Sequence, residues 1–510
     1  MSLHRRLVLI SAAAAALSTV GAGARASSRK PSGGPDFGAL ARAMDGRVIV
    51  PGDREYPQAR QLFQPRYDTV VPGAVAYPAH AGDVAVCLEF ARRCAVPVVP
   101  RGGGHSYAGW STTAAGLVVD VGAMAALAVE GDRVRIGAGA RLGGLNTALA
   151  ARGLGIPTGL CPSVGIAGLT LGGGMGLTSR AYGTTSDALT GVRVVTPDGV
   201  IRDADADRDP DLFWALRGGG GGNFGVVTEF RFRTHPVGDV ASAELRWPGD
   251  DSAAVLEGWQ RWLGGLPDPF WSHLEFLIEA GGDDAPAVRV LCFDGRHELE
   301  RELTRLSDLV GREPRDGSVT VRGYGDTVRA MSGCADADEA QCHVQGTLPG
   351  REPRGRVGRH SYAARSDFWA EPGLAEAAVR AVLAAVRRYR EAVPAGGRGV
   401  VQFLGECGGA MNRPAATDTA FAHRDHAFLA QYLAYWPDSA RAAEVARHQE
   451  WLDGLWRDLR PWASGSAYQN YVDPKLTGWR EAYYGANLAR LEEVRRTYDP
   501  ARLFRFPQAI

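Results

Sequence analysis

Three glycine-rich clusters stand out in the sequence, and the first two also hold a histidine or a cysteine. They are Arg101-Gly102-Gly103-Gly104-His105-Ser106, the run from Cys161 to Gly176, and the run from Gly218 to Gly225. Residues without side chains let backbone N–H groups approach a pyrophosphate, so the clusters predict nests for an anion. None matches the G-x-G-x-x-G fingerprint of dinucleotide-binding folds or the phosphate-binding P-loop.

The clusters resemble those of a known flavoprotein family. The motifs that carry the resemblance are Gly103-Gly104-His105-Ser106-Tyr107, residues 159–165, residues 222–227, Tyr468-Gln469-Asn470-Tyr471, Tyr483-Tyr484-Gly485 and Tyr498-Asp499-Pro500. Together they are similar to the berberine-bridge-enzyme-like branch of the vanillyl-alcohol-oxidase flavoproteins, which have a PCMH-type FAD-binding domain. The resemblance covers about residues 40–510. It implies an FAD whose 8α carbon is bonded to His105 and whose carbon 6 is bonded to Cys161.

The resemblance also implies which residues contact FAD. Beside the two bonded residues, the expected cofactor contacts come from all three clusters and from the tyrosine motif near the C-terminus: Arg101, Gly102, Gly103, Gly104, Ser106, Gly139, Val164, Gly165, Gly168, Gly172, Gly173, Gly176, Asn223, Gly225, Val226, Val227, Tyr468 and Asn470. In this family, the position of Val164 faces the flavin and controls access of oxygen. Valine there is typical of the oxidases, so we expect an oxidase that forms hydrogen peroxide.

The expected catalytic residues are Tyr468, Gln431, Tyr107 and Val164. Tyr468 matches a tyrosine above the flavin, and a phenolate is a reasonable base if a neighbour lowers its pKa from about 10. The alternative for Tyr468 is a structural role beside the flavin ring, and the alternative for Gln431 is a residue that faces the core from a strand. Tyr107 is expected to line the same pocket.

Three positions depart from, or are uncertain within, the family pattern. Plant relatives have tyrosine where Met175 stands and histidine where Leu169 stands, so a catalytic base of the plant type is in doubt. Sugar oxidases of the family carry an acid just before the turn that corresponds to Gly408-Gly409. Glu406 lies near that point, and a solvated or structural role is the main alternative to assisting the base.

Hydrophobic periodicity predicts an α+β fold. Residues 66–125 alternate between strands and helices, including a helix over 82–94, and Val192 to Ile201 reads as a hairpin around Pro197-Asp198-Gly199. Long helices are expected over 371–390 and 440–459. We expect an FAD-binding domain of two subdomains over 27–238, a substrate domain over 239–455 whose antiparallel sheet covers the flavin, and a segment over 456–510 that returns to the FAD domain.

The N-terminus has the pattern of an export signal. Arg5 and Arg6 precede an apolar run and then Ala24-Arg25-Ala26, a small-x-small cleavage site, so residues 1–26 predict a signal peptide. The paired arginines fit the twin-arginine route, with general secretion as the alternative. An extracytoplasmic location allows disulfides. Cys334 and Cys342 are close enough in sequence to pair, whereas Cys87 and Cys94 share a helix face but stand too far apart.

Composition excludes several partners. The chain of 510 residues has 57 basic and 57 acidic side chains, so nothing favours binding to nucleic acid or to an anionic membrane. No cysteine or histidine spacing predicts a metal site. We expect a small-molecule substrate, O2 as acceptor, and a monomer or homodimer. The expected reaction converts an alcohol or sugar hydroxyl of a natural product or carbohydrate to a ketone or lactone. An oxidative cyclase that acts on a C–N or C–H bond, a carbohydrate oxidase and an inactive flavin-binding protein are the alternatives.

Overall fold

The computed structural model describes residues 34–283, 285–394 and 396–510. Residues Phe37–Ile510 form one compact unit, and the domain boundaries after residues 238 and 455 stay a prediction. The predicted signal, residues 1–26, lies outside the described residues. Among the described helices, none is long and apolar enough to cross a membrane.

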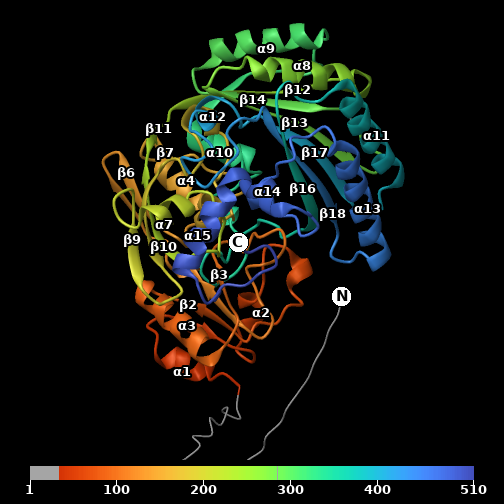
Figure 1. Cartoon of the computed structure of the whole chain (residues 1–510). Helices are drawn as coiled ribbons and strands as arrows, with labels where there is room; N and C mark the ends of the chain where they lie inside the picture. The colour runs from red at the N-terminus through yellow and green to blue at the C-terminus, as the bar shows by residue number, and fades with distance from the viewer. Residues whose placement is uncertain (1–33, 284, 395) are drawn as a thin grey trace, which may run out of the picture. The chain divides into compact units, whose positions relative to one another are not determined.

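The first sheet has four strands and carries the first glycine cluster at its edge. Its order is β1 (Arg47–Ile49), β2 (Ala74–Tyr77), β4 (Leu117–Asp120) and β3 (Val98–Arg101). Strands β2, β4 and β3 run parallel, and β1 is antiparallel. The predicted helix is α3 (Ala81–Cys94), which packs near this sheet (Figure 1). The glycine cluster follows the carboxyl end of β3, where parallel sheets commonly place their ligand-binding loops.

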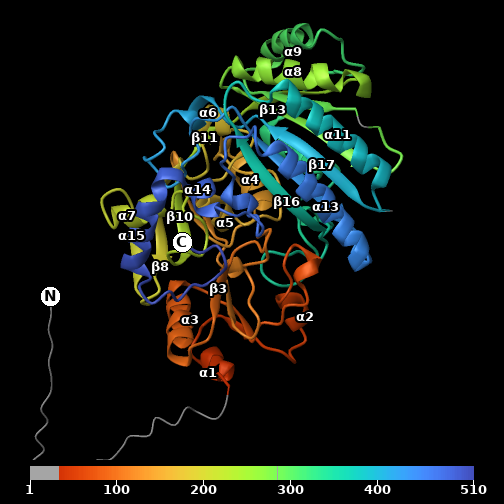
Figure 2. The same ribbon diagram turned by 45° about the vertical axis from the view of Figure 1, so that its right-hand side comes forward.

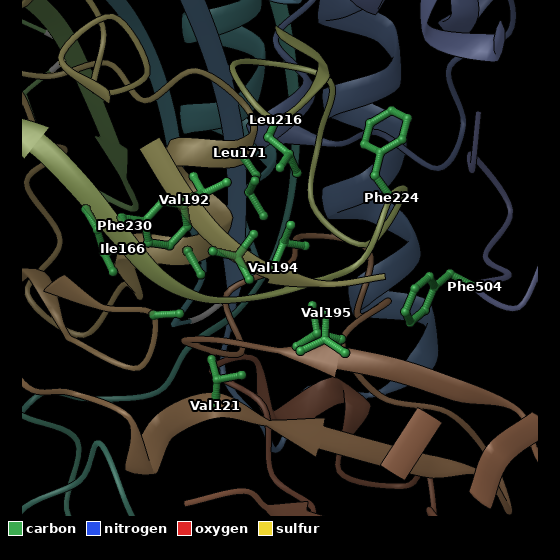
Figure 3. Close-up of a cluster of buried hydrophobic side chains, with 14 of the residues drawn as sticks. Val121, Ile166, Leu171, Val192, Val194, Val195, Leu216, Phe224, Phe230 and Phe504 are labelled. Carbon is green, nitrogen blue, oxygen red and sulfur yellow. The ribbon is translucent and has the colours of Figure 1, made fainter. Parts of the chain in front are cut away.

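The second sheet is antiparallel and forms the main core of the N-terminal half. Its order is β5 (Leu127–Glu130), β6 (Arg133–Gly137), β10 (Val226–Arg233), β8 (Leu189–Val195) and β9 (Ile201–Ala204). The predicted hairpin is present between β8 and β9. Figure 3 shows Val192, Val194 and Phe230 of this sheet in one cluster with Ile166 and Leu171 of α5 (Ile166–Leu171). This packing fixes α5, and with it the second glycine cluster.

The third sheet has seven antiparallel strands. Its order is β15 (Thr320–Gly323), β12 (Asp239–Arg246), β14 (Ala287–Cys292), β13 (Phe270–Glu279), β17 (Arg398–Leu404), β18 (Phe428–Trp436) and β16 (Ser361–Trp369). One face is covered by the helices α8 (Ser252–Gly264), α9 (Arg296–Val310), α11 (Glu376–Ala392) and α13 (Ala442–Leu459) (Figures 1 and 2). Helix α11 begins five residues later than predicted, after Pro372 and Gly373, two residues that disfavour helix.

Shorter elements connect these sheets. They are α1 (Phe37–Arg42), α2 (Tyr56–Ala59), α4 (Leu142–Ala150), β7 (Leu154–Gly155), α6 (Ser179–Tyr182), α7 (Pro210–Ala215), β11 (His235–Pro236), α10 (Tyr324–Met331), α12 (Gly409–Asn412), α14 (Trp479–Tyr484) and α15 (Leu488–Tyr498). Helix α15 packs against α7, and Arg495 Nη1 donates to Asn223 Oδ1 at 3.0 Å. The last segment therefore returns to the N-terminal half, which confirms this prediction and the α+β fold class.

The cysteines behave as expected. Cys334 and Cys342 form a disulfide, as their spacing predicted. Cys87 and Cys94 both lie on α3 and are unpaired. Cys161 forms no disulfide with any described cysteine.

Candidate functional site

One large cavity lies where the glycine clusters, the seven-stranded sheet and the C-terminal segment meet. Its volume is about 470 Å³. Sixteen of the residues that the sequence predicted for the site line it: Arg101, Gly102, Gly103, Gly104, His105, Ser106, Tyr107, Cys161, Val164, Gly165, Gly168, Asn223, Gly225, Val226, Val227 and Asn470. Residues from all three glycine clusters therefore share one site.

The first two clusters touch each other through glycines. A Cβ atom on Gly103 would lie closer than 3.0 Å to the backbone nitrogen of Gly165, and a Cβ atom on Gly165 would meet Gly103 in the same way. Gly104 adopts a φ of +71°, a conformation that strains any other residue. The glycines thus allow two backbone segments to meet at the cavity wall.

His105 and Cys161 lie side by side across Ser163. His105 Nε2 is 2.9 Å from Ser163 Oγ, and Cys161 Sγ is 3.6 Å from the same oxygen. The His105 ring stacks on Phe63 with centroids 4.0 Å apart. Burial, followed by the nearby Arg141 charge, lowers the pKa of His105 to about 3. The imidazole is therefore neutral at pH 7, and its Nδ1 is the nitrogen that Ser163 does not engage.

Tyr107 and Gln431 are joined by a hydrogen bond although they lie 324 residues apart. Gln431 Nε2 donates to Tyr107 Oη at 2.8 Å, and Gln402 Nε2 donates to Gln431 Oε1. Gln402 and Gln431 are opposite each other in β17 and β18. Tyr107 lines the cavity and its ring stacks on Tyr471 with centroids 5.4 Å apart. Gln431 itself is buried behind Tyr107, so it acts on the cavity through that hydroxyl.

Tyr468 lies just behind the cavity wall with 2% of its surface exposed. Its hydroxyl oxygen accepts hydrogen bonds from Gly174 N at 3.0 Å and from Asn470 Nδ2 at 2.9 Å. Burial raises the pKa of Tyr468, and the two donors act in the opposite direction. The tyrosine of this motif that lines the cavity is Tyr471, which packs edge-on against Tyr468 at 5.0 Å.

Some predicted glycines lie behind the wall as well. A Cβ atom on Gly139, Gly172, Gly173 or Gly176 would come closer than 3.0 Å to a neighbouring segment, and for Gly172 that neighbour is the Asn470 side chain. Their glycine identity is explained by contacts inside the protein. Arg101 also has an internal partner, because its Nε lies 2.5 Å from Asp120 Oδ2.

Glu406 is buried close to the tyrosines, which contradicts a solvated position. Trp271 Nε1 donates to its Oε1 at 3.4 Å, and its Oε2 has no hydrogen-bond partner among the described residues. Burial raises the pKa of Glu406 to about 7, and its charge in turn raises the pKa of Tyr468 and of Tyr471. Met175 and Leu169 are apolar neighbours of the same region.

Comparison with known proteins places the chain in a family. Residues 72–205 match the family described as FAD binding domain, and residues 467–510 match the family described as berberine and berberine like. The FAD-linked oxidoreductase YgaK of Bacillus subtilis is 32% identical over 92% of this chain and 97% of its own length. This chain belongs to the berberine-bridge-enzyme-like FAD-linked oxidoreductases.

Two sugar oxidases are similar to this FAD-linked oxidoreductase. The xylooligosaccharide oxidase of Thermothelomyces thermophilus is 30% identical, over 86% of this chain and 87% of its own. A solved structure of glucooligosaccharide oxidase from Acremonium strictum has a TM-score of 0.81 at 25% identity and covers 92% of this chain and 97% of its own. That protein is described with a 6-S-cysteinyl, 8α-N1-histidyl FAD. The predictions of an FAD-linked oxidoreductase and of its family are confirmed.

The residues around the cavity fit FAD on two structural observations. Glycine backbones form the wall at the loops that hold His105 and Cys161, so a planar ring and a pyrophosphate can approach the main chain. The neutral His105 ring has one engaged nitrogen and one free nitrogen.

Several lining side chains of the FAD-linked oxidoreductase were missed from the sequence. They include Phe63, His360, Tyr362, Arg398 and Tyr435. Three of them come from β16, β17 and β18, whose side chains alternate between the helix-covered face and the cavity face. That alternation was visible in the sequence, but which face meets the flavin was not.

One exposed group of ligand-type side chains lies away from the cavity. Asp45, His80 and Asp83 bring one ligand atom each to within 4.8 Å of the others. Asp83 accepts hydrogen bonds from the backbone N–H groups of Asp45, Gly46 and Ala79 and thereby closes the turn before α3. The group has a structural explanation.

Proposed function

We propose that this chain is an oxidase with FAD held by two covalent bonds, and that it oxidises an alcohol or sugar hydroxyl to a ketone or lactone while O2 is reduced to hydrogen peroxide. The observation that carries the proposal is the placement of His105 and Cys161 across Ser163 in one glycine-walled cavity. When bound, FAD accepts the hydride from the substrate carbon and passes two electrons to O2.

His105 and Cys161 are the proposed attachment residues. In the neutral tautomer whose hydrogen is on Nε2 and faces Ser163, Nδ1 carries the lone pair and is the nucleophilic atom. Burial raises the pKa of Cys161, and Ser163 lowers it, so the serine assists formation of the thiolate. Each bond replaces one hydrogen of the flavin and one hydrogen of the side chain, and O2 takes up both hydrogens with their electrons.

Tyr468 is the proposed base. Two N–H donors point at its oxygen, and they offset part of the rise in the Tyr468 pKa that burial causes. Asn470 lines the cavity and donates to that oxygen, so it connects the cavity wall to the proposed base. Proton removal then accompanies departure of the hydride from carbon.

Tyr107 and Gln431 are the proposed orienting pair. Gln431 uses its N–H to hold the Tyr107 oxygen, which leaves the Tyr107 hydrogen free to be donated into the cavity. The stacked ring of Tyr471 keeps Tyr107 in place. The pair thus fixes the position of the substrate oxygen relative to the plane of the flavin ring.

Val164 is proposed to leave space for O2. It lines the cavity next to the contact between Gly103 and Gly165. A leucine would fill the volume through which O2 approaches. We further propose that the N-terminal segment directs export, since two arginines precede its apolar run.

Peroxide formation tests the proposed function. The purified holoenzyme is offered sugars and secondary alcohols, and O2 uptake and hydrogen peroxide are measured together. We expect one peroxide per product and a slower reaction with O2 in Val164→Leu. A reduced holoenzyme that is reoxidised slowly by air, with valine in place, would contradict the oxidase.

A further inference from the structure

The cavity has an uneven charge. Among the described lining residues there is no aspartate or glutamate, whereas three arginines take part: Arg101, Arg398 and Arg505. Arg101 is neutralised by Asp120. Arg505 is exposed and its Nε donates to the Arg502 carbonyl in the C-terminal tail. Arg398 is therefore the cation that the sheet presents to the cavity.

Arg398 forms no ion pair with a carboxylate in the part of the chain that the structure describes. Its Nε is buried and has no hydrogen-bond partner among the described residues. Its guanidinium instead lies over the Tyr435 ring, with Cζ 4.4 Å from the centroid. Glu279 is opposite Arg398 in the β13–β17 pair but is exposed, and no ion pair forms between them. A half-buried guanidinium without a carboxylate partner keeps N–H groups that an anionic ligand can engage.

The surroundings of Arg398 favour a flat ligand. Tyr362 and Tyr435 pack at 5.1 Å, and His360 stands edge-on to Tyr435 at 6.4 Å. Burial and the Arg398 charge lower the pKa of His360, so this ring is neutral at pH 7. One fixed cation between apolar ring faces matches a carboxylate carried on a sugar or aromatic ring, because the guanidinium fork binds a carboxylate through two parallel hydrogen bonds.

Strand β17 and the tyrosine rings beside it limit the length of the ligand. Arg398 and Gln402 lie four residues apart on β17 and project to the same face. At about 3.3 Å per residue, they are separated by roughly 13 Å. Gln402 leads through Gln431 to Tyr107, which is proposed to hold the substrate oxygen. Tyr435 and Tyr362 bridge the space between Arg398 and Tyr107: Arg398 Cζ is 4.4 Å from the Tyr435 ring, Tyr435 is 5.1 Å from Tyr362, and Tyr362 is 5.2 Å from Tyr107. A ligand no longer than a disaccharide therefore spans the two ends of the site.

From this geometry we infer that the substrate is an acid: a hydroxyl compound with a carboxylate within two sugar rings of the oxidised carbon, held by Arg398. This inference rests on the proposed oxidase function and specifies its substrate class. For an acidic disaccharide, the anomeric carbon loses a hydride and its hydroxyl loses a proton, which yields the lactone, while O2 becomes hydrogen peroxide.

A matched pair of substrates tests the inference. Cellobiose and cellobiouronic acid differ only in a terminal CH2OH or COO− group. We expect kcat/KM of the holoenzyme to be roughly 10–100-fold higher for the acid, mostly through KM, as one charge-assisted bidentate contact provides. Arg398→Gln should reduce the ratio to about one, and Arg398→Lys should keep part of it. Arg322→Gln, on the exposed edge strand β15, is the control and should keep the full ratio.

Binding separates this inference from the proposed function. The flavin absorbance of the holoenzyme is titrated with each disaccharide without turnover, under anaerobic conditions at fixed ionic strength. Preferential binding of the acid that depends on Arg398, with neither sugar oxidised, would support the inference and count against the sugar-oxidase reaction. Equal affinities, or a preference for the acid that survives Arg398→Gln, would overturn the inference.

Discussion

The glycine loops and the seven-stranded sheet build different walls of the cavity by different means. The loops contribute backbone from short contiguous motifs, with His105 and Cys161 as the reactive side chains. The sheet contributes side chains from three separate strands, which include Tyr362, Arg398 and Tyr435. The loop wall holds the residues that the family resemblance assigns to FAD binding. We expect the sheet wall to decide what is oxidised, because function depends on the site and not on the fold.

The largest expected effect is on the loop wall. In Gly103→Ala, the new Cβ collides with Gly165 N, and backbone on both sides leaves no flexible atom to yield. We expect loss of bound flavin and a free energy of unfolding reduced by several kcal/mol, at the severe end for one substitution. Flavin absorbance per protein and urea unfolding measure both. Gly454→Ala, within α13, is the control and should be as stable as the parent or more so.

The next effect separates the two tyrosines of the site. Tyr468→Phe should lower kcat by about 100-fold or more with little change in KM, since a general base is removed. Tyr107→Phe should mainly raise KM. Steady-state kinetics distinguish them, with Tyr432→Phe, a tyrosine on the helix face of the same sheet, as control. If Tyr107→Phe lost kcat while Tyr468→Phe kept it, the base would be Tyr107.

Gln431 tests whether the two walls are coupled. Gln431→Leu removes the donor to Tyr107 and leaves Gln402 without its partner. We expect a KM about tenfold higher and a loss of roughly 1–3 kcal/mol in stability. The double variant with Tyr107→Phe should lose less than the sum of the single variants, because both remove one interaction. Additive losses would mean that the hydrogen bond does not connect the walls.

The last effect concerns Glu406 and appears only with pH. Its pKa is about 7 in the folded protein against an ordinary value of 4.5, so folding favours the protonated carboxyl. That contribution is complete below about pH 4.5 and is lost as pH rises through 7. The free energy of unfolding of Glu406→Gln should therefore rise relative to that of the parent across this window, by about 3 kcal/mol above pH 7. Unfolding from pH 4 to 9 measures it, with the exposed Glu313→Gln expected to show no trend.

The same contrast explains what could be predicted from the sequence. His105, Cys161 and the loop glycines lie in contiguous motifs. The resemblance of these motifs to the family was enough to predict that they share one cavity. The hydrogen bond between Tyr107 and Gln431 depends on a register between strands far apart in the chain, as do the positions of Arg398 and Tyr435. Gly172, Gly173 and Gly176 show the converse: glycines in a motif that serve close packing behind the wall.

The central claim is the double attachment of FAD, and the mass of the denatured protein tests it most directly. Denatured parent protein should carry one FAD per chain, on the peptides with His105 and Cys161. His105→Ala and Cys161→Ala should each keep FAD through the other bond, with an altered absorption spectrum, and the double variant should release it all. Parent protein that loses FAD on denaturation, or a double variant that still holds it covalently, would contradict the account.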